Sequence, residues 1–398
     1  MRRPWLVLVL VLGLLSACGA PHEVATVTLW HSYSADERVA LEELATRWNA
    51  SHRDLRVELV NVPYDAFSDK ITAAIPNGNG PDLFIFAHDR VGDWAQAGLL
   101  EPVEFWVDET LADRFDLQAV SAMAYRGSLY GLPLAVKSLA LYWRTDLLER
   151  PPATTDELLE VGRRFTRTGQ GRFGLVYENS KLYGHAAWLH GFGGAVFAAD
   201  GRPTLATPAA RAALEFARTL AAFVPSEATA TLCATLFNEG RAPLAMSGPW
   251  FVGGIGAQVA WAVAPLPMVS ATGRPAAPFL GVEGVMMSAR ARDKRAAFAV
   301  MEWLTGDESA VLRARRARQV VPNRAAYADA AVGGDKVLAA FRAQAEVAVP
   351  MPATPAMRMV WTPYDTAIQK VVSQGVDADA ALAEAQREVE SYMQGTAR

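Results

Sequence analysis

Apolar runs in the first hundred residues are short and are separated by longer amphipathic segments. Such runs predict strands, and apolar residues spaced three and four positions apart predict helices. The expected strands are residues 27–30, 55–62 and 83–86, and the expected helices are residues 36–48, 66–75 and 93–97. Strands that alternate with helices favour a largely parallel sheet with helices on both faces. Ligands of such sheets lie at the carboxyl ends of the strands.

The rest of the chain repeats this alternation. The expected strands are residues 138–142, 174–177, 243–246 and 261–264, and the expected helices are residues 155–165, 182–190, 208–223 and 229–238. A further strand and a long helix follow within residues 278–305, and residues 377–394 form an amphipathic helix. At 398 residues the chain is long enough for two domains with separate cores. The predicted fold class is therefore α/β.

The first twenty residues, MRRPWLVLVLVLGLLSACGA, combine two arginines with one apolar run. That run has the length of a signal-peptide core and falls short of the roughly 20 residues that span a membrane. It ends in Leu-Ser-Ala-Cys-Gly, which resembles the lipobox of bacterial lipoproteins. We expect residues 1–17 to be a signal peptide, Cys18 to carry a lipid that anchors the chain to a membrane, and residues 18–26 to be a leader. The alternative is a plain secretory signal that contains a cysteine.

Composition narrows the class of protein. Hydrophobic residues make up 51% of the chain and charged residues 20%, which is typical of a folded globular protein. Loss of Arg2 and Arg3 with the signal peptide changes the formal charge from −4 to −6, so no nucleic-acid partner is expected. The basic stretch at residues 313–318 continues an amphipathic helix and predicts a solvated face. Cys233 is the only cysteine besides Cys18, and therefore no disulfide is expected.

Five longer segments share one resemblance. They are GPDLFIFAHDRVGDWAQAGLLEPV, YGLPLAVKSLALYWRTDLL, LFNEGRAPLAMSGPW, APFLGVEGVMMSA and VPMPATPAMRMVWTPYDTAI. In order and along essentially the whole mature chain, they resemble the periplasmic maltose/maltodextrin-binding protein family of ABC importers. The resemblance implies the type II periplasmic-binding-protein fold, with two α/β lobes that each hold a mainly parallel sheet. It also implies that a maltose-, maltodextrin- or trehalose-like di- or oligosaccharide binds between the lobes, outside the cytoplasm, and passes to the permease subunits.

The same resemblance implies where the lobes begin and end. The first lobe would hold residues 27–135 and 284–330, and the second residues 140–279 and 337–398. The chain would cross between them at residues 136–139, 280–283 and 331–336. Several crossings make a hinge that moves the lobes as rigid bodies.

The site residues are also carried over from the resemblance. Sugar hydroxyls need charged or amide partners, and the apolar face of a sugar ring needs an aromatic surface. Asp89 and Arg90 match positions that bind hydroxyls, whereas His88 matches a position with a structural role. The other matched contacts are the stacking aromatics Trp250, Trp361 and Tyr183, the floor residue Met351, the small residue Ala87, and Phe86 in place of a tryptophan. Trp30 and Tyr33 follow the first strand and are weaker candidates.

Departures from the family pattern concern charge. Lys137 stands where the family has a cleft glutamate, and Lys181 stands where it has another carboxylate. Ala66 and Ser68 replace a charged pair, although Tyr64 and Asp65 lie nearby and could substitute. These changes predict a less negative pocket, which would suit a different disaccharide or a sugar that carries an acidic group.

Two other functions remain open. An extracytoplasmic carbohydrate-active enzyme is disfavoured because the chain has no His-Glu-x-x-His and no Gly-x-Ser-x-Gly, but paired carboxylates of a glycosidase leave no local pattern. A sugar sensor or surface receptor that is not coupled to import would use the same closure. We expect no cofactor, no metal and a monomer.

Overall fold

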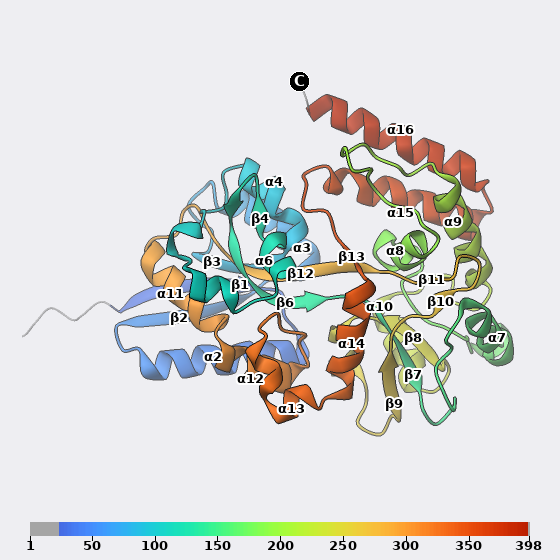
Figure 1. Cartoon of the computed structure of the whole chain (residues 1–398), viewed down its shortest axis with the longest axis horizontal. Coiled ribbons are helices and arrows are strands. Elements are labelled where there is room, and N and C mark those ends of the chain that lie inside the picture. The colour runs from blue at the N-terminus through green and yellow to red at the C-terminus, as the bar shows by residue number, and fades with distance from the viewer. Residues whose placement is uncertain (1–23, 397–398) are drawn as a thin grey trace, which may run out of the picture.

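The computed structural model describes residues 24–396, which form two lobes side by side (Figure 1). The predicted signal peptide and Cys18 lie outside the described residues. Within the described part, no helix combines the length and the apolarity needed to cross a membrane.

The first lobe contains most of a six-stranded mixed sheet. Strand β1 (Ala25–His31) lies between β2 (Leu55–Asn61) and β3 (Leu83–Ala87), and both pairings are parallel. The strand order is β13-β12-β3-β1-β2, and β6 also pairs with β12. Helices α2 (Ala35–Ser51), α3 (Tyr64–Ala74), α4 (Val91–Gln96), α11 (Lys294–Leu304) and α12 (Asp307–Ala317) belong to this lobe. The parallel order β3-β1-β2 confirms the expectation for the first third of the chain.

Helix α2 shows how local sequence produces this packing. Its buried residues are Ala40, Leu41, Leu44, Ala45 and Trp48, spaced to form one face. That face joins Val27 and Leu29 of β1 in one buried cluster. Asp36 and Glu37 lie in its first turn, where the positive end of the helix dipole stabilises negative charge.

The second lobe is built on a three-stranded sheet in the order β8-β7-β9. Strands β8 (Leu244–Ser247) and β9 (Trp261–Ala264) both pair antiparallel with β7 (Ala140–Arg144). The expected mainly parallel sheet is therefore wrong for these ladders, because alternation of strands and helices does not encode strand direction. The predicted strand at residues 174–177 is also absent as a strand, and contributes one parallel bridge from Val176 to Ala245.

Helices surround this small sheet. They are α7 (Thr155–Phe165), α8 (Leu182–Gly191), α9 (Pro208–Ala221), α10 (Ala230–Asn238), α14 (Lys336–Val347), α15 (Met357–Gln374) and α16 (Ala378–Thr396). Three of them begin with a threonine whose hydroxyl accepts a hydrogen bond from the third helical residue: Thr154, Thr207 and Thr229. Such caps satisfy backbone N–H groups that have no partner within the helix.

Three strands lie between the lobes (Figure 1). Strand β6 (Gly131–Lys137) runs antiparallel to β12 (Phe279–Met287), and β13 (Val349–Pro350) pairs with the start of β12. Only Ser138 and Leu139 separate β6 from β7 in the second lobe. The strand predicted at residues 138–142 is observed as β7, displaced by two residues, and its first two residues form the junction with β6.

The remaining elements are short. They are η1 (His88–Arg90), η2 (Glu104–Trp106), α5 (Glu109–Asp113), α6 (Leu117–Ala122), β4 (Ala124–Tyr125), β5 (Ser128–Leu129), η3 (Thr168–Gln170), η4 (Pro249–Gly254), β10 (Met268–Val269), β11 (Arg274–Pro275), η5 (Ala325–Ala328) and α13 (Ala330–Gly333).

The basic stretch on α12 is only partly a solvated face. Arg315 and Arg316 are exposed and pair with Asp329 and Glu43. Arg313, in contrast, is 1% exposed and donates from Nη1 to the carbonyl oxygen of Leu134 in β6. The prediction was wrong for Arg313, because its face of α12 packs on β6.

Candidate functional site

Three aromatic residues of the second lobe lie close together. Trp250 follows β8 in η4 and is 40% exposed, and its ring centroid lies 6.3 Å from that of Tyr183 in α8. Trp361, from α15, is half-buried and packs edge-on against Phe279 at 6.0 Å. Tyr183 and Trp361 rest on the same buried cluster, which also contains Met351. The four matched positions therefore form one apolar wall.

Local structure fixes the position of the Trp250 ring over Gly248. A Cβ on Gly248 would lie 2.1 Å from the indole of Trp250, so only glycine lets this ring fold back against its own backbone. The hydroxyl of Tyr142 in β7 donates to the carbonyl oxygen of Gly248 at 2.7 Å. The turn that carries Trp250 is thereby tied to the central strand of the sheet.

Asp89 and Arg90 lie in η1, directly after β3. Burial raises the pKa of Asp89 to about 6, although the nearby Arg90 guanidinium acts in the opposite direction. Arg90 Nη1 lies 3.8 Å from Asp93 Oδ2, and the same oxygen lies 3.5 Å from Arg358 Nη1 of α15. Asp93 thus links the first lobe to the helix that carries Trp361.

His88 connects this strand end to β12 and to Met351 through two hydrogen bonds. Its Nδ1 accepts a hydrogen bond from Val282 N in β12 at 3.0 Å, so its Nε2 carries the proton and donates to the carbonyl oxygen of Met351 at 2.8 Å. Burial lowers the pKa of His88, which favours this neutral ring. His88 therefore has the structural role that its position predicted.

Phe86 does not face the cleft. Its ring is 6% exposed and stacks against Phe67 at 5.0 Å and Tyr64 at 5.3 Å. Tyr64 is 59% exposed and covers it. The structure therefore places Tyr64 at the surface that the sequence assigned to Phe86. Ala87 is partly buried and lies opposite Glu283 in the ladder between β3 and β12.

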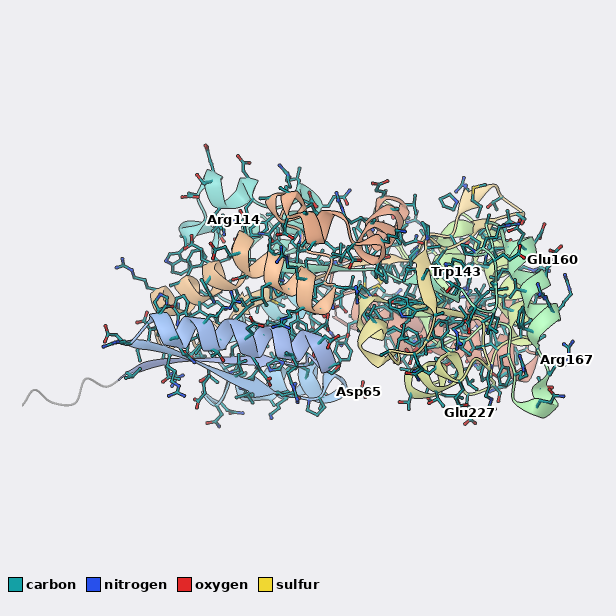
Figure 2. The ribbon with its side chains drawn as sticks, turned by 90° about the horizontal axis from the view of Figure 1, so that it is seen from below. Asp65, Arg114, Trp143, Glu160, Arg167 and Glu227 are labelled. Carbon is teal, nitrogen blue, oxygen red and sulfur yellow. The ribbon has the colours of Figure 1, made fainter. Side chains whose placement is uncertain are left out.

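Charged residues outside the second lobe shift the pKa of Tyr183 in the aromatic wall. The pKa of Tyr183 is raised by burial and then by the charges of Glu283 and Asp89, so these groups lie near one another across the lobes. Asp65 is exposed at the end of the first lobe nearest the second (Figure 2). Its charge contributes to raising the pKa of Glu178 in the second lobe, although burial is the largest cause. Charged groups of the first lobe and of β12 therefore act on residues of the second lobe across the boundary between the lobes.

Lys137 is buried in a cluster of charges. Its Nζ pairs with Glu37 Oε1 of α2 and lies 3.2 Å from Glu283 Oε2 of β12. Tyr33 donates to Glu283 at 3.0 Å. Burial alone would lower the pKa of Lys137, but the two carboxylates outweigh it and hold this pKa above its ordinary value. Burial raises the pKa of Glu283, and Lys137 opposes that shift.

Both lysines that depart from the family pattern form ion pairs with carboxylates. Lys137 is balanced by Glu37 and Glu283, and Lys181 lies 3.2 Å from Asp365 Oδ2. The predicted less negative pocket stays a prediction, but both lysines on which it depends have carboxylate partners within the chain. Glu283 could have been noticed, since it is the one charged residue in the apolar strand FLGVEGVMM. Glu37 and Asp365 lie on amphipathic helices and gave no such signal.

The two walls meet at one end of the gap. Lys137 Nζ lies 5.8 Å from the ring centroid of Trp250 and 5.7 Å from that of Tyr33. A Cβ on Gly253 in η4 would lie 3.0 Å from the Cβ of Ala35 at the start of α2. Trp30, in contrast, is 8% exposed within the first-lobe core.

Comparison with known proteins places this geometry in context. Residues 32–311 match the family model described as bacterial extracellular solute-binding protein. A maltotriose-binding protein of Pyrococcus abyssi is 29% identical over 377 residues, covering 93% of this chain and 83% of the relative. A galactooligosaccharide-binding protein of Bacillus subtilis is 26% identical and covers 83% of this chain and 82% of the relative.

Solved structures agree. The maltose/maltodextrin-binding domain of Bdellovibrio bacteriovorus bound to maltotriose matches with a TM-score of 0.86 at 26% identity, covering 93% of this chain and all of that one. The maltotriose-binding protein of Thermus thermophilus with maltotriose matches with a TM-score of 0.85 at 27% identity, covering 92% of this chain and all of that one. The predicted two-lobe α/β fold is confirmed.

Proposed function

Because this chain belongs to the bacterial extracellular solute-binding proteins, we propose that it captures an oligosaccharide between its lobes and delivers it to the permease subunits of an ABC importer. The observation that carries this proposal is an aromatic wall of the second lobe with hydrogen-bonding charges of the first lobe beside it. Trp250 and Tyr183 lie 6.3 Å apart on one side, and Asp89 lies on the other, close enough for its charge to shift the pKa of Tyr183.

Each side suits one part of a sugar. Aromatic rings cover the apolar face of a pyranose, and charged groups bind its hydroxyls. Apart from its own backbone N–H, no described residue donates a hydrogen bond to the Asp89 carboxylate, so it has acceptor capacity left for hydroxyl donors. Arg90 and Tyr64 supply donors beside it.

The ligand we propose is a neutral oligosaccharide of the maltodextrin type. An acidic sugar would need an unpaired positive charge in the site. Lys137 and Lys181 do not provide one, because both are paired with carboxylates. The two relatives named above for maltotriose and galactooligosaccharide support an oligosaccharide and leave its linkage to experiment.

Closure of the lobes completes the site in this proposal. The first lobe comprises residues 27–135 and 284–330, the second residues 140–279 and 337–398. Segments 136–139, 280–283 and 331–336 act as the hinge. A ligand shifts the balance toward the closed form only through contacts that the open form lacks, so both walls are required.

Removal of the indoles tests the proposal. Trp250→Ala and Trp361→Ala should each weaken maltotriose binding by more than about tenfold, or about 1.4 kcal/mol, in isothermal titration calorimetry. Trp106→Phe is the matched control, because Trp106 packs on Phe298 in the first lobe. Unchanged affinity in both alanine variants would contradict the cleft assignment. A wild-type protein that binds none of a panel of neutral oligosaccharides would contradict the sugar proposal.

We further propose that the chain acts as a lipid-anchored monomer without catalysis. Residues 1–17 and Cys18 have the lipoprotein pattern, and two acyl chains anchor a protein stably. A mass spectrum of the mature amino terminus that lacks the lipid would contradict the anchor. Release of reducing sugar from maltotriose by the purified protein would contradict the absence of catalysis.

A further inference from the structure

Asp365 joins two helices of the aromatic wall. It lies on α15 four residues after Trp361, so the two side chains share one face of that helix. Its Oδ1 accepts a hydrogen bond from Leu182 N, the first residue of α8, at 2.7 Å. Its Oδ2 lies 3.2 Å from Lys181 Nζ. The residue after Leu182 is Tyr183, the second ring of the wall.

Helix α8 depends on this contact because it lacks a cap of its own. Its N-cap residue is Lys181, whose side chain accepts no hydrogen bond, whereas α7, α9 and α10 begin with capping threonines. A helix start needs acceptors for its first N–H groups, and a negative charge there also favours the helix dipole. Asp365 supplies both from a different helix.

The contact between Asp365 and the start of α8 is sheltered and lies beside both rings of the wall. The Asp365 side chain is 20% exposed, and Lys181 is 56% exposed, so the carboxylate is the more sheltered member of the pair. Tyr183 and Trp361 both pack on the buried cluster that includes Leu182 and Tyr364. Movement of the start of α8 away from α15 would therefore separate the two rings.

We propose that Asp365 is the positioning residue that sets the spacing of Tyr183 and Trp361 in the sugar site, by capping α8 from α15. The inference rests on the proposed function, since it assigns Asp365 a role in sugar affinity. A purely structural contact would lower the melting temperature of the protein and leave affinity unchanged for the folded protein.

Variants separate capping from charge. Asp365→Ala removes the acceptor and should weaken maltotriose binding about tenfold, measured well below the melting temperature. Asp365→Asn keeps an oxygen for Leu182 N and should restore affinity to within about threefold of wild type. Lys370→Met is the matched control, because Lys370 on the same helix pairs with Glu384 of α16 at 2.6 Å and should leave affinity unchanged. If Asp365→Ala does not fold, Asp365→Glu, which displaces the carboxylate by one methylene, should weaken binding about threefold.

The outcomes distinguish this inference from the proposed function. Wild-type affinity in Asp365→Ala, or in Asp365→Glu where that replaces it, would overturn the inference while wild-type binding of maltotriose still stands. Equal losses in the alanine and asparagine variants would also overturn it, because capping would then not be the cause. Failure of the wild-type protein to bind any oligosaccharide would instead overturn the proposed function.

Discussion

The two walls of the cleft are built from different chemistry and are held in different ways. The second-lobe wall consists of rings that are fixed through backbone contacts, such as the bond from Tyr142 to the carbonyl of Gly248. The first-lobe and hinge wall consists of charges that are fixed by one another, with Lys137 between Glu37 and Glu283. Apolar rings need only area, whereas a buried charge must have a partner or shift its pKa.

Within the charged wall, Lys137 and Asp89 represent these two solutions. Lys137 has two carboxylate partners, and its pKa lies above the ordinary value. Burial raises the pKa of Asp89 to about 6, and the Arg90 charge and a hydrogen bond from its own backbone N–H offset this only in part. The charge of Lys137 is thus satisfied within the protein, whereas the Asp89 carboxylate forms no salt bridge among the described residues.

The largest expected effect tests whether Lys137 stabilises the fold through its ion pairs with Glu37 and Glu283. Lys137→Met would leave Glu37 and Glu283 largely buried without a cation partner, and breaking a buried ion pair costs about 3–5 kcal/mol. Urea unfolding should show this loss of free energy of unfolding. Arg150→Gln is the control, because the pair of Arg150 with Glu157 is exposed and should change stability by less than about 1 kcal/mol. A comparable small loss in Lys137→Met would assign Lys137 to the binding surface instead.

An intermediate effect tests whether the walls must meet. Gly253→Leu would collide with Ala35 across the gap and hold the lobes apart, so the closed population and the apparent affinity for maltotriose should fall about tenfold. Gly254→Leu is the matched control, since a Cβ on Gly254 would meet no atom within 4 Å. Small-angle X-ray scattering of Gly253→Leu with saturating sugar should retain the larger radius of gyration. Full compaction with wild-type affinity would show that this contact does not limit closure.

The smallest expected effect tests whether the Asp89 carboxylate accepts hydrogen bonds from the sugar. If ionised Asp89 binds sugar hydroxyls, its pKa of about 6 makes affinity fall about fourfold from pH 7 to pH 5.5 as the carboxylate is protonated. Asp89→Asn should remove this pH dependence. In the ligand-free protein the sign is opposite, because a raised folded-state pKa means that stability falls as pH rises from about 4 to 6. A flat affinity profile in the wild-type protein would exclude Asp89 as a charged contact.

Much of the fold and part of the site could be predicted from sequence, because both depend on local pattern. The spacing of apolar residues alone predicted α7 with its observed bounds, and it predicted the strand before His88. Resemblance located Trp250 and Trp361, which the structure brings onto one wall with Tyr183.

Other features depended on contacts between distant segments. Lys137 and Glu37 are 100 positions apart, and no local period reports that their charges cancel. The burial of Arg313, the cover that Tyr64 provides over Phe86 and the antiparallel direction of β7 with β8 are decided in the same way. A side chain's spacing tells which face of its own element it occupies, but the group that faces it, and hence its charge state and exposure, is set only when the chain has folded.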